Sequence, residues 1–129
     1  MLKVVFTLEA AVDFAYGVAL IAVPGPLLAL YDMRTDEAGT YLGHFLAGTF
    51  IGFGLINWFA RSWPDSTARR LIIRANFATT ALGLLATLAY VLQAGTSPRV
   101  WAIVILTAAL TVAWGWFAAE TLRAGRPGD

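Results

Sequence analysis

The sequence predicts an all-α protein, a four-transmembrane-helix bundle with a short interfacial helix between the first and second spans. Three observations support this prediction. Hydrophobic residues make up 59% of the 129 residues and charged residues only 13%, against about 45–50% and about 25% in soluble domains. Four segments each contain the roughly 20 apolar residues that cross a bilayer. The polar chain between them is too short to cover so much apolar surface, so we expect a single integral membrane domain over residues 1–129.

The expected spans cover residues 4–23, 40–60, 71–93 and 100–119. Pro24 and Pro26 end the first span, because proline cannot continue the helical hydrogen-bond ladder. The apolar segment at residues 27–33 follows them and is typical of a short interfacial helix. Short polar segments separate the remaining spans.

Basic residues near the span ends predict the orientation, because cytoplasmic loops carry an excess of lysine and arginine. Seven lie on the side of the two termini, and only Arg34 and Arg99 lie on the other side. We therefore expect a multi-pass protein of a bacterial inner membrane, with both termini in the cytoplasm and membrane lipids around it. The expected cytoplasmic aromatic belt consists of Trp58, Trp63, Trp114 and Trp116. The net charge of +1 and the scattered arginines argue against a nucleic-acid partner.

Two carboxylic acids, Glu9 and Asp13, lie inside the first span. Asp13 is expected about 14 Å along a span of about 30 Å, near the midplane, with Glu9 one turn away on the same helix face. A charged acid at this depth is costly. It needs a proton, a hydrogen-bonding partner or access to water. The pair is therefore the expected ligand or proton site, and its alternative role is to hydrogen-bond the helices together.

A polar stripe on the third span can face these acids. It contains Asn76, Thr79 and Thr80, which are expected at the depths of Glu9 and Asp13. Threonines in membrane helices also bond to their own backbone one turn back, which is the alternative interpretation of this stripe.

The second span carries Asn57 and Arg61 on one side, and Arg61 is the expected cationic partner of Glu9. The opposite side carries Gly48 and Gly52 at four-residue spacing. Small residues at this spacing let another helix approach closely, either within the chain or in a second copy of it. We therefore expect a close helix crossing at these glycines and consider a homodimer a candidate assembly.

His44 is the only histidine, and the chain has no cysteine. A metal site built from protein side chains alone is therefore not expected, and no cofactor is predicted. His44 is a secondary candidate for the polar site, expected about 9 Å from Asp13 in depth. The sequence contains no nucleophile elbow, phosphate-binding glycine loop or HExxH motif, which favours a protein without catalytic residues.

The segment from "VPGPLLALYDM" through "AGTYLGHFLAGTFIGFGLINWFAR" resembles a group of small bacterial four-span membrane proteins, loosely the DoxX-like proteins. The shared features are the proline-ended first span, the LALY segment, the glycine-rich second span and its final W.AR pattern. An arginine often stands in those proteins where His44 stands here. The resemblance implies the same fold and a membrane location, and it implies no particular activity.

Three classes of function remain open at this point. The first is a protein that binds or carries a small apolar or cationic ligand through a polar intramembrane site around Asp13. The second is a non-catalytic accessory or assembly subunit of a membrane complex. The third is a lipid-embedded enzyme acting on an apolar substrate. A cavity that reaches Asp13 favours the first class, an exposed glycine ridge the second, and a pocket shared by Asp13 and His44 the third.

Overall fold

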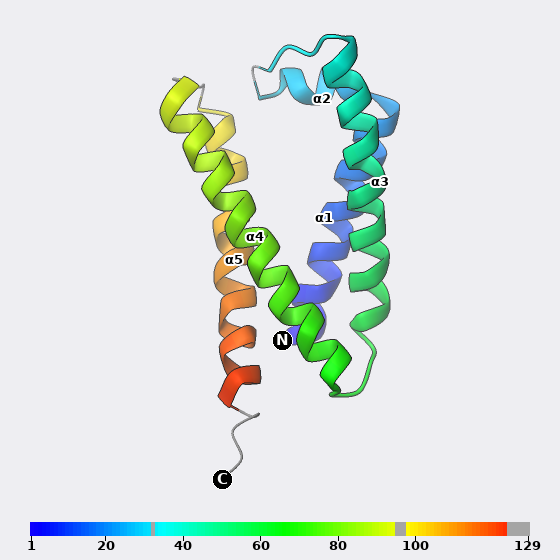
Figure 1. The fold of residues 1–129 in the computed structure, drawn as a ribbon, viewed down its shortest axis with the longest axis vertical. Helices are drawn as coiled ribbons and strands as arrows, with labels where there is room; N and C mark the ends of the chain where they lie inside the picture. Colours follow the sequence, from blue (N-terminus) through cyan, green and yellow to red (C-terminus); the bar gives the residue numbers. More distant parts are fainter. Residues whose placement is uncertain (32, 95–97, 124–129) are drawn as a thin grey trace.

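The computed structural model describes residues 1–31, 33–94 and 98–123 (Figure 1). The helices in these ranges are α1 (Leu2–Ala22), α2 (Pro24–Ala29), α3 (Glu37–Ala60), α4 (Thr67–Ala94) and α5 (Val100–Arg123). No strand occurs in the described ranges, so the predicted all-α class is confirmed.

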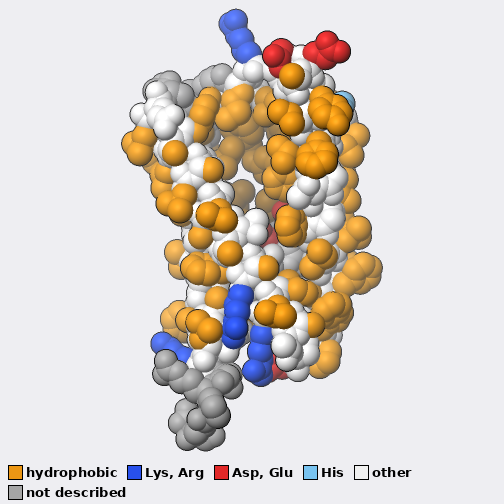
Figure 2. Space-filling view, viewed as in Figure 1, with side chains coloured by type: hydrophobic (Ala, Val, Ile, Leu, Met, Phe, Trp, Pro, Cys, Tyr) orange, Lys and Arg blue, Asp and Glu red, His pale blue; other side chains and the backbone are white. Residues whose placement is uncertain are grey.

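Four helices are long and apolar enough to cross a membrane, as expected of a multi-pass membrane protein. They are α1, α3, α5 and the part of α4 from Thr67 to Gln93. Helices suit a lipid environment because each satisfies its own backbone hydrogen bonds. Apolar side chains cover much of the face in Figure 2, and most charged side chains there lie toward the two ends of the bundle.

Three of these helices begin earlier than the sequence predicted, and capping side chains account for the early starts of α3 and α4. Asp36 caps α3, because its carboxylate accepts a hydrogen bond of 2.8 Å from the Gly39 amide. Ser66 acts in the same way before α4, where its hydroxyl accepts a 3.3 Å bond from the Arg69 amide. The prediction counted apolar residues, whereas capping side chains extend a helix through polar residues.

The long helices form two pairs (Figure 1). In the first pair α1 packs along α3, and in the second α4 packs along α5. The pairs meet at the end of the bundle where α1 begins and α5 ends, here called the terminal end. They diverge toward the opposite end, which carries α2 and is called the α2 end.

Glycines set the close approach of α1 to α3, but they are not the predicted ones. An added Cβ would lie 3.1 Å from an α3 carbonyl oxygen at Gly17, and 3.3 Å from an α1 carbonyl oxygen at Gly54. A Cβ at Gly48 or Gly52 would have no atom of another helix within 4 Å. The predicted close crossing at Gly48 and Gly52 is therefore wrong within this chain, because α3 turns the opposite face toward α1.

A cluster of buried side chains joins the two pairs at the terminal end. Its members come from all four long helices and are Phe6, Ala60, Ile73, Trp114 and Ala118. The rings of Phe6 and Trp114 meet edge to face, with centroids 4.8 Å apart and an interplanar angle of 77°. This geometry is a favourable one for aromatic pairs. The cluster therefore fixes the first pair against the second at this end.

The short helix predicted between the first two spans is present as α2, although it starts three residues earlier than predicted and ends at Ala29. Pro24 occupies the start of α2, where its missing N–H costs nothing. Tyr31, just after α2, packs against a cluster of Val91, Val100 and Val104 on α4 and α5. Its hydroxyl lies 2.5 Å from that of Tyr16 on α1. The segment after α2 therefore links the two helix pairs at the α2 end.

An ion pair at the start of α4 gives a first testable prediction. Arg70 donates hydrogen bonds of 3.0 and 2.6 Å to the two carboxylate oxygens of Asp65. These bonds lower the pKa of Asp65 below its usual 3.8. The pair should stabilise the folded protein fully above pH 3.8, and the contribution should vanish as the pH falls through the lowered pKa. Carbon-13 NMR titration of the Asp65 carboxyl should give a midpoint that rises toward 3.8 in Arg70→Gln. An identical midpoint in the variant would contradict the assignment.

Candidate functional site

The divergence of the two helix pairs leaves a cavity of about 340 Å³. Figure 2 shows a hollow between the pairs, with acidic side-chain atoms inside it. Side chains from all four long helices line the cavity, and its apolar walls consist of Val12, Leu46, Phe50, Phe53, Ile103, Leu106 and Leu110. This volume lies at the lower end of the range for small-molecule sites, which are also lined mostly by apolar groups.

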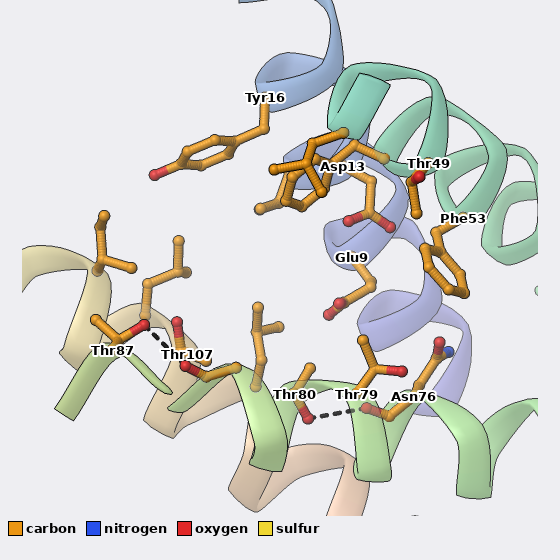
Figure 3. Close-up of a pocket in the computed structure, with 17 residues that line it drawn as sticks. Glu9, Asp13, Tyr16, Thr49, Phe53, Asn76, Thr79, Thr80, Thr87 and Thr107 are labelled. Carbon is orange, nitrogen blue, oxygen red and sulfur yellow. Dashed lines mark hydrogen bonds between the residues drawn. The ribbon is translucent and has the colours of Figure 1, made fainter. Parts of the chain in front are cut away.

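Glu9 and Asp13 lie in the wall of this cavity, one turn apart on α1. Their side chains point into the space between α1 and α4 (Figure 3). Both residues are buried, with 8% of Glu9 and 6% of Asp13 exposed. Asn76, Thr79 and Thr80 of α4 line the same cavity. The structure therefore brings these five predicted site residues together.

A chain of side-chain amides connects Asp13 to the second helix pair. The Asn57 Nδ2 group of α3 donates to an Asp13 carboxylate oxygen at 3.4 Å. The Asn76 Nδ2 group of α4 donates in turn to the Asn57 side-chain oxygen at 2.6 Å. Asn57 is 1% exposed, so it needs both partners. The two asparagines therefore join α1, α3 and α4 beside the cavity.

Glu9 has a different partner, Trp114 of α5. The Trp114 indole Nε1 donates a 3.0 Å hydrogen bond to a Glu9 carboxylate oxygen. Sequence reasoning assigned Trp114 to the aromatic belt and missed this contact. A buried indole N–H usually has a polar partner. A tryptophan within a predicted span was therefore the available signal for a hydrogen-bond donor to a buried acid.

Three threonines of α4 line the cavity, and two of them bond to the backbone of their own helix. Thr80 donates a 2.9 Å hydrogen bond to the Asn76 carbonyl oxygen, and Thr87 donates a 2.8 Å bond to the Gly83 carbonyl oxygen (Figure 3). These hydroxyls therefore satisfy backbone acceptors of their own helix, which was the alternative interpretation. Thr79 also lines the cavity, together with Thr49 of α3.

The structure does not form the predicted ion pair between Arg61 and Glu9. The Arg61 guanidinium lies instead 3.1 Å from the centroid of the ring of Trp58, a residue in the last turn of α3. Arg61 follows the last residue of α3, where its side chain can keep a cation–π contact without entering the apolar interior. Within the described ranges the one ion pair joins Asp65 and Arg70, so neither acid of the cavity has a cationic partner there.

Three further candidate residues lie outside the cavity. His44 is exposed on α3 and is not part of the lining. Gly48 and Gly52 have open space where a side chain would be. The described residues contain no group of three or more His, Cys, Asp or Glu side chains that could hold a metal ion.

No protein-family model, curated protein or solved structure matches this chain.

Proposed function

We propose that the chain is a small integral membrane protein that binds or carries a small apolar or cationic ligand in the cavity around Asp13. One observation supports this function best. An apolar-walled cavity of about 340 Å³ contains two carboxyl groups, and no described side chain supplies a cation to either. Ligand sites combine apolar walls with a few polar groups that orient the ligand. Asn57 and Trp114 hold the two acids in place from neighbouring helices.

The proposed location of the protein is the inner membrane of a bacterium, with both termini in the cytoplasm. Its support is the excess of basic residues at the terminal end, which includes Arg61, Arg69, Arg70 and Arg74. A relationship to the DoxX-like proteins is also part of this proposal. A reporter enzyme fused to the C-terminus that is active only outside the cytoplasm would contradict the orientation.

A second candidate function is that of an accessory subunit, and the exposed face of α3 favours it. Gly48 and Gly52 have no neighbour where a side chain would be, so a helix of another chain can approach there. A homodimer through this face is the simplest form of the candidate. The enzyme alternative has less support, because His44 does not share the cavity with Asp13.

Filling the cavity should weaken ligand binding severalfold, and Gly83→Leu is the variant that fills it. Gly83 lines the cavity, and an added Cβ would meet only the Thr107 methyl group, at 3.8 Å. The leucine side chain should therefore enter the cavity without displacing the backbone. We expect photolabelling by a diazirine-bearing octanol to fall severalfold at the lining residues, as measured by mass spectrometry of the protein in nanodiscs.

The matched control is Gly48→Leu, which places the same side chain on the open face of α3. This variant should keep the wild-type labelling of the cavity. Equal labelling in wild type and Gly83→Leu would mean that the cavity does not hold the probe, and it would contradict the proposed function.

A further inference from the structure

The carboxyl groups of the cavity have more hydrogen-bond acceptor capacity than the protein uses. An ionised carboxylate offers about four lone-pair sites. Glu9 receives a side-chain bond of 3.0 Å from Trp114, and Asp13 receives one of 3.4 Å from Asn57. The Asp13 bond is long for an N–H···O contact. Because both carboxyl groups are directed into the cavity (Figure 3), their remaining acceptors are available to a ligand that donates hydrogen bonds.

Positive charge is the component that this site lacks. The polar groups that line the cavity beside the two acids are Tyr16, Thr49, Asn76, Thr79, Thr80, Thr87 and Thr107. None of these side chains is a cation, and the Trp114 indole that binds Glu9 from α5 is neutral. A buried carboxylate is stable only when a proton, an opposite charge or several hydrogen bonds compensate it. A ligand that carries positive charge and N–H donors would complete the site.

The rest of the cavity suits an apolar body attached to that charge. Tyr16 and Phe50 stack in its wall, with ring centroids 5.9 Å apart and an interplanar angle of 29°. Phe53 of α3 and Leu106 of α5 add apolar surface from the two helix pairs. Aromatic faces near the acids also attract cations. The walls therefore favour an alkyl or aryl group of modest size.

We infer, on the basis of the proposed function, that the ligand is a membrane-soluble primary or secondary amine. It enters as the neutral base, because the hydrocarbon core disfavours ions. In this route Asp13 is protonated in the empty cavity, where no described cation compensates it, and its carboxyl proton moves from oxygen to the amine nitrogen. An ammonium ion forms, hydrogen-bonded to the Asp13 carboxylate, and no net charge crosses the lipid. Glu9 supplies a second acceptor one turn away.

This route separates amines from two other ligands of similar shape. An alcohol can donate a hydrogen bond but takes up no proton from Asp13. A quaternary ammonium ion has no N–H group and cannot enter uncharged. The test titrates octylamine, octanol and octyltrimethylammonium into protein in zwitterionic nanodiscs, with empty nanodiscs subtracted. We expect octylamine to bind roughly tenfold more tightly than octanol, as for other charge-assisted hydrogen bonds, and octyltrimethylammonium to bind more weakly than octylamine.

Infrared spectra of the same samples follow the proton. Octylamine should decrease the protonated carboxyl band and increase the carboxylate band, whereas octanol should leave the ratio of the two bands unchanged. Asp13→Asn should remove the preference for the amine and keep binding of octanol. Glu120→Gln is the matched control, because Glu120 is exposed outside the cavity and accepts a bond from Trp116. It should behave as wild type.

The outcomes distinguish this inference from the proposed function. Equal affinity of the wild-type protein for octylamine and octanol would overturn the amine inference and leave the apolar cavity as a binding site. Absence of binding by all three compounds would overturn both. Because the wild-type comparison and the infrared bands need no variant, they decide the question even if Asp13→Asn fails to fold.

Discussion

Replacement of Trp114 by alanine is expected to lower the free energy of unfolding by about 3–5 kcal/mol, the usual range for removing a large buried aromatic side chain. Trp114 is 0% exposed and packs against Phe6 at the terminal end. Its loss leaves a cavity where the two helix pairs meet. It also leaves Glu9 without its hydrogen-bond donor. Both effects act on the small area that holds the pairs together.

Unfolding in mixed micelles at increasing denaturing detergent measures this loss. Trp114→Phe keeps an aromatic ring beside Phe6 but removes the N–H group and the five-membered part of the indole. It should cost about 1–3 kcal/mol for the buried acceptor left unpaired, with a smaller loss of packing than in Trp114→Ala. Trp116→Ala is the control, since Trp116 is 66% exposed. A loss in Trp114→Ala no larger than in Trp116→Ala would contradict the role of Trp114.

Replacement of Gly17 by leucine is expected to separate α1 from α3. A Cβ at Gly17 would lie 2.6 Å from the Ile51 Cγ1 atom and 3.1 Å from the Ala47 carbonyl oxygen. Since the second contact is with backbone, a change of side-chain rotamer cannot relieve it. Overpacking of this kind typically costs 1–3 kcal/mol and sometimes more, so we expect a loss of about 3 kcal/mol.

Gly52→Leu provides the comparison, because a Cβ at Gly52 has no neighbour within 4 Å. The same detergent titration should show a stability close to that of wild type. Equal destabilisation by Gly17→Leu and Gly52→Leu would contradict the open position of Gly52 and the packing of α1 described here. Mass measurement in nanodiscs should accompany the comparison, because Gly52→Leu should also weaken a homodimer formed through this face.

The sequence was sufficient to predict which residues share a depth in the bundle. Residues rise 1.5 Å each along a helix, so the positions of Asp13, Asn76 and Thr80 along their helices could be calculated. In the structure these residues line one cavity. The four spans could be predicted for a similar reason, because the length of an apolar segment needs no knowledge of its neighbours.

Rotation of a helix about its own axis could not be predicted in the same way. In a membrane, apolar side chains can face lipid or another helix, so hydrophobicity does not distinguish the two faces. Glycines occur on both sides of α3, and the prediction chose Gly48 and Gly52 although Gly54 packs against α1. The partners of Arg61 and Trp114 could not be predicted either, because they depend on which helices pack together.

Synthesis of the chain proceeds from the N-terminus, so the pair of α1 and α3 can assemble before α4 and α5 leave the ribosome. During that interval Asp13 can already receive its bond from Asn57, which belongs to the first pair. Glu9 must wait for Trp114, 105 residues later in the chain. In that order of assembly, Glu9 lacks its hydrogen-bond donor until α5 packs against α1. We therefore expect the docking of α5 to be the step that satisfies this acid.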